Sequence, residues 1–288
     1  MKTYQQLWQS LTPLYDVGEA QAIVRLVLEV KYGMTLTDII CGKVNDLSAD
    51  EGIKLEEIVR RLQKGEPVQY VLGQADFAGR TFHVEPGVLI PRPETAELCQ
   101  WITEDCNATP SRSYPEAIPK QILDICTGSG CIAITLALDI PYTEVEGWDI
   151  SEEAISIAQQ NVQTLGAKQV SILRQDALAL PQQERLWDII VSNPPYICNK
   201  EKTGMERNVL DYEPDIALFV PDQEPLLFYC SIARFAAVQL RRNGKLYFEI
   251  NPIYEKEMKE MLEGFGFQHI ETKEDFFGKK RMMRAEKY

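Results

Sequence analysis

The segment WDIIVSNPPYI, residues 187–197, joins a short apolar block to an amide, two prolines and an aromatic ring. The apolar block has the length and β-branched content of a parallel strand that is covered on both faces. Pro194 and Pro195 end the strand, because each fixes its own φ and lacks an N–H group. The sequence therefore predicts a buried strand with a stiff corner at its carboxyl end.

Two interpretations of this corner are open. In the first, Asn193 caps an ordinary proline turn. In the second, the Asn193 side-chain carbonyl and the Pro194 backbone carbonyl accept hydrogen bonds from an NH2 group, and Tyr196 offers a flat face to a planar amide or a nucleobase. The second interpretation makes Asn193, Pro194 and Tyr196 the candidate catalytic residues, and adds Pro195 to the candidate substrate site.

A glycine loop lies upstream, in the segment ILDICTGSGCIAI at residues 122–134. Gly128 and Gly130 allow a ligand to approach the backbone closely. Asp149 follows about 20 residues later at the end of the next predicted strand, where a carboxylate can accept the hydroxyl groups of a ribose. Asp176 follows the third strand and is placed to contact an adenine. Together, the loop and the two carboxylates predict an adenosine ligand.

The choice of cofactor depends on charge. A dinucleotide site needs a third glycine, in the pattern G-x-G-x-x-G, with the pyrophosphate at the helix N-terminus, and that glycine is missing here. Asp124, directly before the loop, repels phosphate but favours the ammonium or sulfonium group of S-adenosylmethionine. We therefore expect S-adenosylmethionine. The alternative for Asp124 is a capping or turn carboxylate.

Composition limits the classes of function. The 288 residues are 45% hydrophobic and 25% charged, as in soluble globular proteins, and the net charge of -13 argues against broad contact with nucleic-acid phosphates. Seven scattered cysteines and two histidines argue against a disulfide framework and a metal site. The chain shows no run of membrane-span length and no signal-peptide pattern, so we expect a cytoplasmic protein with a protein or small-molecule substrate.

The sequence predicts three parts. Residues 1–66 have helical periodicity and form a small bundle, with a capping box between Ser48 and Glu51. Residues 67–92 are punctuated by glycine and predict a β-hairpin linker. Residues 93–288 alternate between strands and helices, and the stretch at 107–119, rich in Pro, Ser and Thr, indicates an exposed connection.

Strands are expected at 121–125, 144–149, 170–174, 187–192 and 245–250, with a terminal hairpin at 267–272 and 281–285. Helices are expected at 95–106, 130–138, 152–165, 225–240 and 253–263. This alternation predicts an α/β fold with a doubly wound, mostly parallel seven-stranded sheet that binds ligands at the carboxyl ends of its strands.

Four motifs occur in one chain and in this order: VLG at 71–73, LIPRPET at 89–95, DICTGSG at 124–130 and SNPPYI at 192–197. With them the chain resembles the HemK/PrmC family of protein-(glutamine-N5) methyltransferases over nearly its whole length. The Asn-Pro-Pro-Tyr motif alone is shared with DNA enzymes that methylate amino groups, whereas the Pro-Arg-Pro-Glu segment is more specific to this family.

The resemblance implies a class I S-adenosylmethionine-dependent methyltransferase. Its substrate would be the glutamine of the GGQ motif in class 1 peptide chain release factors, so it would affect translation termination. The helical bundle would contact the release factor, residues 193–196 would hold the glutamine, and the enzyme would act as a monomer without nucleic acid or a membrane. The expected cofactor site consists of Asp124, Cys126, Thr127, Gly128, Ser129, Gly130, Asp149, Asp176, Ala177 and Asn193.

The chain departs from the family pattern at three positions. Cys126 stands where glycine is common, Ala177 where some members have an aromatic residue, and Asn251 where glycine is common. Two interpretations of Arg92 are open, a surface charge and a role near a ligand, and the sequence assigns no role to Glu249. Two alternative functions remain: an amino-methyltransferase for a nucleic-acid base, which needs a basic groove, and a non-enzymatic adenosine-binding protein, which leaves the Asn-Pro-Pro-Tyr motif unexplained.

Overall fold

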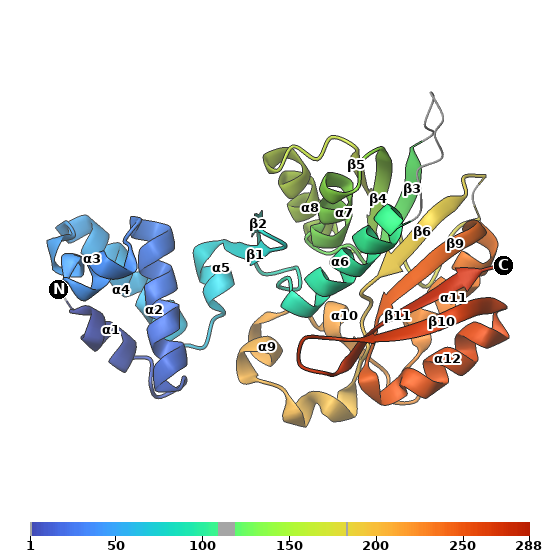
Figure 1. Ribbon diagram of the computed structural model, residues 1–288. Helices are drawn as coiled ribbons and strands as arrows, with labels where there is room; N and C mark the ends of the chain where they lie inside the picture. Colours follow the sequence, from blue (N-terminus) through green and yellow to red (C-terminus); the bar gives the residue numbers. More distant parts are fainter. Residues whose placement is uncertain (1, 109–118, 183) are drawn as a thin grey trace. The chain divides into compact units, whose positions relative to one another are not determined.

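The computed structural model describes residues 2–108, 119–182 and 184–288 (Figure 1). The chain forms two compact units. One contains the described residues up to Gln74 together with Met205–Tyr212, and the other contains those of Ala75–Gly204 and Glu213–Tyr288. The connection expected at 107–119 falls mainly outside the described residues, and its first two residues belong to a helix. The three-part division expected from the sequence remains a prediction.

The first unit is a helical bundle, as its apolar periodicity predicts. Ser48 caps one helix as expected, because its hydroxyl accepts a hydrogen bond from the Glu51 N–H while the Glu51 carboxylate accepts one from the Ser48 N–H at 2.8 Å. Leu7, Leu28 and Leu55 are buried in the core of this unit. Its helices are α1 (Tyr4–Gln9), α2 (Val17–Tyr32), α3 (Leu36–Ile40), the 3-10 helix η1 (Lys43–Asp46), α4 (Ala49–Leu62), α5 (Val68–Leu72) and α9 (Arg207–Tyr212).

Helix α5 differs from the sequence-based expectation, which assigned its residues to the hairpin linker. Pro67 precedes the helix, and Gly73 ends it in the left-handed region with φ +74°. Five residues are too few to show a helical period, so the sequence carried no signal for this turn of helix.

The predicted hairpin follows and is confirmed. It consists of β1 (Gln74–Phe77) and β2 (Arg80–His83). Ala78 and Gly79 form the turn with positive φ angles, which suit a two-residue hairpin turn. The rings of Phe77 and Phe82 meet edge to face, with centroids 5.8 Å apart.

The second unit contains the predicted seven-stranded sheet, with the order β10-β11-β9-β6-β3-β4-β5. Five strands run parallel: β3 (Lys120–Ile125), β4 (Thr143–Asp149), β5 (Val170–Arg174), β6 (Trp187–Ser192) and β9 (Leu240–Glu249). The terminal hairpin of β10 (Phe267–Glu274) and β11 (Lys280–Lys287) adds two antiparallel strands. The chain first builds the sheet outward from β3 to β5 and then returns to place β6 on the other side of β3. The crevice at this reversal is where doubly wound sheets bind ligands.

Helices cover both faces of the sheet (Figure 1). On one face lie α6 (Pro93–Ala108), α7 (Cys131–Asp139) and α8 (Glu152–Thr164), and on the other lie α11 (Leu227–Gln239) and α12 (Glu255–Gly264). Successive residues of β6 alternate between the two cores, since Ile189 and Val191 pack in one and Ile190 packs in the other. This double coverage explains why β6 is apolar at Trp187 and from Ile189 to Val191.

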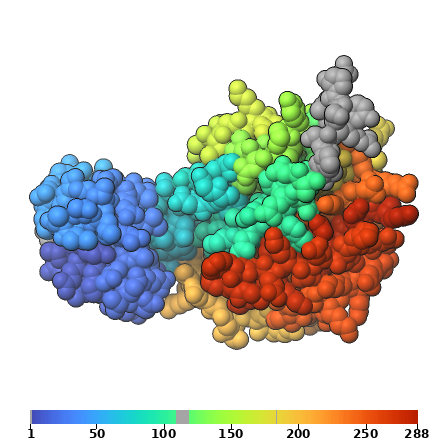
Figure 2. All heavy atoms as spheres, in the orientation of Figure 1, coloured from blue at the N-terminus to red at the C-terminus, as the bar shows by residue number. Residues whose placement is uncertain are grey.

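Helix α6 is fixed to the C-terminal strands. Its Asp105 carboxylate accepts hydrogen bonds from Lys245 Nζ at 3.2 Å, from the Tyr247 hydroxyl at 2.5 Å and from Arg284 Nη1 at 2.5 Å. In the space-filling view, the green atoms of α6 lie directly against the red atoms of the terminal hairpin (Figure 2). These contacts hold α6, and therefore Thr95 in its first turn, in a fixed position beside β9.

Short elements that the sequence did not predict connect the main strands. They are β7 (Ile197–Cys198), η2 (Asn199–Gly204), α10 (Asp215–Leu218), β8 (Phe219–Val220) and η3 (Pro252–Tyr254), and β7 and β8 pair in parallel. Elements of two to six residues are too short to leave a periodic pattern. Among the described residues, no helix combines the length and apolarity of a membrane span. The same residues contain no group of three or more His, Cys, Asp or Glu side chains that could hold a metal ion.

Candidate active site

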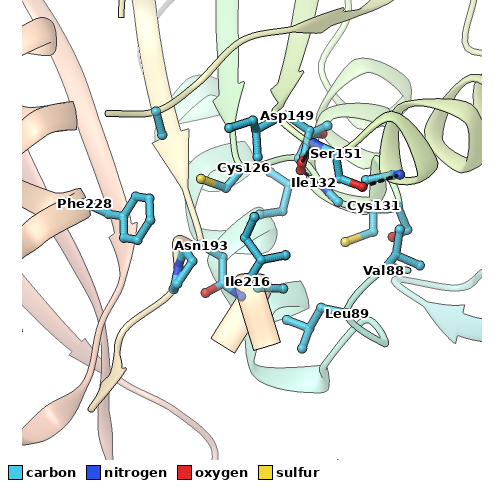
Figure 3. A pocket seen from close by; sticks show the side chains of 18 of the residues that line it. Val88, Leu89, Cys126, Cys131, Ile132, Asp149, Ser151, Asn193, Ile216 and Phe228 are labelled. Atoms are coloured by element: carbon cyan, nitrogen blue, oxygen red, sulfur yellow. Dashed lines mark hydrogen bonds between the residues drawn. The ribbon is translucent and has the colours of Figure 1, made fainter. Parts of the chain in front are cut away.

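A cavity of about 310 Å³ lies at the carboxyl ends of β3, β4 and β6 (Figure 3). Most of the residues predicted for the cofactor and substrate line it, namely Cys126, Thr127, Gly128, Ser129, Asp149, Asp176, Ala177, Asn193 and Pro195. Four predicted residues are not among the described residues that line it: Asp124, Gly130, Pro194 and Tyr196. The fold therefore brings the two sequence motifs together around one space.

The glycine loop turns its backbone toward this cavity. Cys126 and Gly128 have left-handed φ angles of +64° and +55°, and the Thr127 N–H donates to the Trp148 carbonyl at 3.0 Å. A Cβ atom added to Gly128 would meet no atom of the described residues within 4 Å, so this residue faces open space among them. Cys126, a non-glycine residue in the same region, carries about 1 kcal/mol of backbone strain.

Gly130 has a different reason to be glycine. A Cβ atom there would lie 3.1 Å from Ile134 Cδ1 and 3.2 Å from Ala158 Cβ. Its φ of +80° also lies in the left-handed region. Packing of α7 against α8 therefore requires the small residue, and ligand contact at Gly130 remains a prediction.

Asp149 ends β4 and holds the loop through backbone groups. Its Oδ2 accepts a hydrogen bond from the Gly128 N–H at 2.8 Å, and its Oδ1 accepts one from the Ser151 N–H at 3.0 Å. Burial raises the pKa of Asp149, while the hydrogen bonds from Ser151 and Gly128 oppose the rise. Each carboxylate oxygen retains a further lone pair for a ligand hydroxyl, as the ribose prediction requires.

Asp124 is fully buried and makes its contacts with the loop and with α7. Its Oδ2 accepts hydrogen bonds from the Thr127 hydroxyl at 2.5 Å and from the Ala133 N–H at 3.2 Å. Its Oδ1 accepts none from any residue that the structure describes. Burial raises the pKa of Asp124 to about 7, against the effect of its hydrogen bonds. These contacts are those of a turn carboxylate, and an influence on the charge of a cofactor remains a prediction.

Asp176 and Ala177 line the cavity beyond the end of β5. Asp176 Oδ1 accepts a hydrogen bond from the Leu178 N–H at 2.8 Å, which fixes the turn. The Ala177 carbonyl accepts one from the Ser231 hydroxyl at 2.7 Å and so joins the turn to α11. The predicted contact with adenine is compatible with this placement and remains a prediction.

Asn193 follows the end of β6 and lies beside the start of the glycine loop, because Ser192 of β6 pairs with Ile125 of β3 (Figure 3). Its Nδ2 donates to Thr95 Oγ1 at 3.3 Å, and the Thr95 hydroxyl donates to Glu249 Oε2 at 2.5 Å. The Tyr196 hydroxyl donates to Glu249 Oε1 at 3.0 Å. Sequence reasoning did not assign Thr95 or Glu249, because these contacts join segments that are far apart in the chain.

Comparison with known proteins identifies the family. The PrmC N-terminal domain family matches residues 5–73, and the Methyltransferase small domain family matches residues 112–210. A release factor glutamine methyltransferase of Bacteroides thetaiotaomicron is 48% identical over 278 residues and covers 96% of each chain. One from Flavobacterium psychrophilum is 38% identical over 286 residues, covering 99% of this chain and 98% of its own. The chain belongs to the release factor glutamine methyltransferase family.

Solved structures share the fold of this family member. The T. thermophilus 16S rRNA N2 G1207 methyltransferase, in complex with AdoMet and guanosine, has a TM-score of 0.53 and 23% identity, over 75% of this chain and 50% of that chain. A human methyltransferase 10 domain containing protein has a TM-score of 0.52 and 15% identity, over 72% and 88%. The class I methyltransferase fold is confirmed, and the enzyme is an S-adenosylmethionine-dependent methyltransferase.

The residues that line the cavity fit S-adenosylmethionine. The cavity volume is in the range of small-molecule sites. Open space over Gly128 leaves the backbone accessible to a ligand, and Asp149 and Asp176 line the cavity with carboxylates that can accept hydrogen bonds from hydroxyl and amino groups. Apolar side chains, among them Ile150 and Phe228, complete the wall for a purine ring.

Arg92 lines the same cavity and is paired. Its Nη2 donates to Glu213 Oε1 at 2.5 Å, and Glu213, whose side chain is only 1% exposed, also accepts from the Ile90 N–H at 3.2 Å. Glu213 directly precedes the segment that brings Ile216 and Ala217 to the cavity wall. Arg92 therefore joins the Pro-Arg-Pro-Glu segment to that wall, which is more than a surface charge would do.

Several apolar residues of the cavity wall were missed by sequence reasoning. They come from loops and helix ends and include Ile150, together with Val88, Leu89, Ile216 and Phe228, which Figure 3 labels. Leu89 belongs to a quoted motif, so the motif was the one signal that could have included it. Phe228 lies in the first turn of α11, where its apolar character is indistinguishable in sequence from that of a core residue.

Proposed function

We propose that this enzyme transfers the methyl group of S-adenosylmethionine to the side-chain amide nitrogen, N5, of the GGQ glutamine in class 1 peptide chain release factors. Membership in a family whose relatives are named release factor glutamine methyltransferases supports the proposal. The observation that carries it is the orientation of Asn193: its NH2 group is engaged by Thr95, so its carbonyl oxygen is the group left for a substrate amide.

The chemical task of the protein is to orient a poor nucleophile. The lone pair of a carboxamide nitrogen is delocalised into its carbonyl group. We propose that Asn193 Oδ1 and the Pro194 carbonyl accept the two amide hydrogens and hold the nitrogen toward the cofactor cavity. When bound, S-adenosylmethionine supplies an electrophilic methyl group. The nitrogen loses a proton after the N–C bond forms, so no residue is assigned as a general base.

Tyr196 and Pro195 complete the proposed substrate site. The Tyr196 hydroxyl is fixed by Glu249, and this contact limits how the ring can move beside the amide. We propose that the ring packs on the amide plane of the glutamine, as the sequence motif predicts.

The partner and setting are proposals as well. We infer that the helical bundle contacts the release factor, and that the enzyme works as a cytoplasmic monomer without nucleic acid or a membrane. The net charge of -13 supports a protein substrate over a polyanion.

The test is methyl transfer from labelled S-adenosylmethionine to a purified class 1 release factor, with the modified residue located by mass spectrometry. We expect one methyl group on the GGQ glutamine and no label on a release factor whose GGQ glutamine is replaced by alanine. Duplex DNA serves as a second acceptor. Labelling of DNA with no labelling of the release factor would overturn the proposal in favour of base methylation.

A further inference from the structure

Glu249 is a buried carboxylate that holds two hydroxyl groups at the edge of the active site. It ends β9, is 3% exposed, and accepts hydrogen bonds from Thr95 at 2.5 Å and Tyr196 at 3.0 Å. Its own backbone carbonyl accepts from the Tyr229 hydroxyl at 2.9 Å, which anchors the residue to α11. Among the described residues, no cationic side chain forms an ion pair with Glu249.

The direction of each hydrogen bond follows from what each group can do. An ionised carboxylate only accepts, and a hydroxyl has a single proton to donate. Thr95 gives that proton to Glu249, so toward Asn193 it can only accept. Asn193 must therefore turn its NH2 group to Thr95, and its carbonyl oxygen is left for the substrate.

We propose that Glu249, acting through Thr95, sets which end of the Asn193 amide faces the substrate. Thr95 and Glu249 are thus positioning residues, whereas Asn193 contacts the glutamine. This inference rests on the proposed function, because it specifies how that same site presents an acceptor to an amide N–H. The NH2 group of the substrate glutamine donates hydrogen bonds and therefore requires an acceptor. With its amide rotated by 180°, Asn193 would instead present its own NH2 group, which is also a donor.

The cost of burying Glu249 supports a role beyond packing. A charge removed from water without an ion pair is costly, and Arg281 favours ionised Glu249 only through its charge; an apolar residue of similar size would fill the site with a smaller penalty. Burial raises the pKa of Glu249, and the two hydroxyl groups oppose that rise by stabilising the ionised form. The ionised form is the one that makes Thr95 an acceptor toward Asn193.

The three side chains of Glu249, Thr95 and Asn193, joined by hydrogen bonds, are called the relay here. The first test removes the hydroxyl group of Thr95, the middle residue of the relay. Thr95→Val keeps the shape but has no hydroxyl, so Asn193 loses its fixed orientation. We expect kcat for release factor methylation to fall about tenfold, while KM for S-adenosylmethionine stays within about twofold. Thr95→Ser, which restores the hydroxyl, should recover most of the loss. Thr95→Val with wild-type kcat would overturn the inference.

The second test reverses the relay. In Asn193→Asp, two carboxylates compete for the one proton of Thr95, and kcat should fall. Adding Glu249→Gln supplies an amide NH2 group that can donate a hydrogen bond to the Thr95 hydroxyl. Thr95 can then donate its own proton to one oxygen of the carboxylate at position 193. The other carboxylate oxygen again presents an acceptor to the substrate. Glu249→Gln should therefore lower kcat severalfold in the wild-type background and raise it severalfold in the Asn193→Asp background. The same sign in both backgrounds would overturn the inference.

Glu94 provides the matched control. It precedes Thr95 on α6 and acts on Glu249 through its charge, without a hydrogen bond to the relay among the described residues. If Glu94→Gln rescues Asn193→Asp as well as Glu249→Gln does, removal of negative charge explains the rescue and the relay is wrong. Melting curves identify variants that fail to fold. A wild-type enzyme that does not methylate release factor overturns the proposed function itself, whereas an active wild type whose folded variants depart from these expectations overturns only the relay.

Discussion

Two buried carboxylates, Asp124 and Glu249, each hold a residue of the cavity wall, and they do so in different ways. Asp124 contacts Thr127 and Ala133, which lie three and nine residues away in sequence, and thereby fixes a backbone loop. Glu249 contacts Thr95 and Tyr196, which lie 154 and 53 residues away, and thereby fixes side chains. The proposed cofactor end, at the glycine loop, is thus fixed by local contacts to the backbone, and the proposed substrate end, at Asn193, is fixed by side chains that only the complete sheet brings together.

The largest effect is expected at the substrate end. Asn193→Ala removes the proposed acceptor for the amide, so kcat/KM for release factor methylation should fall roughly 100-fold or more, the scale for one preorganised transition-state contact. The melting temperature should change little, because the side chain borders a cavity. Single-turnover methylation and a melting curve measure both quantities. A stable Asn193→Ala protein with near-normal transfer would contradict the mechanism, and a strongly destabilised one would favour the turn-capping interpretation.

The next effect belongs to the cofactor end. Asp149→Ala should weaken S-adenosylmethionine binding by about 1–3 kcal/mol, since ligand hydroxyls lose a charged acceptor and the Gly128 N–H loses its partner. Calorimetry on the free enzyme measures this loss. At saturating cofactor, kcat should recover most of its value, unlike in Asn193→Ala. Unchanged cofactor affinity would show that the ribose assignment is wrong.

This contrast also explains what the sequence could predict. The apolar run of β6, the paired glycines of the loop and the carboxylate at the end of β4 each leave a pattern within a few neighbouring residues. The pairing of Thr95 with Glu249 leaves none, because it depends on β9 lying beside β6 and on α6 lying across β9. The placement of Asp124 could not be predicted either, since a carboxylate before a glycine loop looks the same whether it faces a ligand or the core.

The buried carboxylate at the cofactor end also predicts how stability depends on pH. The folded state raises the pKa of Asp124 from 3.8 to about 7, so between these values it binds a proton that the unfolded chain has released. Stability from this group is full below about pH 4 and is lost as pH rises toward 7. Within that window, the free energy of unfolding of the wild type should fall with pH by up to about 1.4 kcal/mol per pH unit more than that of Asp124→Asn. Equal slopes in denaturant titrations would show that Asp124 is ionised in the folded state.

The smallest effect tests whether a ligand approaches the backbone at Gly128. An added Cβ meets no atom within 4 Å in the part of the chain that the structure describes, and the φ of +55° is left-handed, so Gly128→Ala should reduce stability by only about 1 kcal/mol. S-adenosylmethionine affinity should nevertheless fall several-fold, because the methyl group enters the space that the cofactor is proposed to occupy.

Gly166→Ala separates these two consequences. Gly166 also has a left-handed φ, +68°, and also has open space at its Cβ position, but it follows α8 and does not line the cavity among the described residues. Both variants should lose similar stability in denaturant melts, because the backbone strain is the same in kind. Calorimetry should show weaker cofactor binding for Gly128→Ala alone. Equal affinities in the two variants would mean that the cofactor does not lie against the glycine loop. The open space at Gly128 would then have to be explained by a ligand other than S-adenosylmethionine.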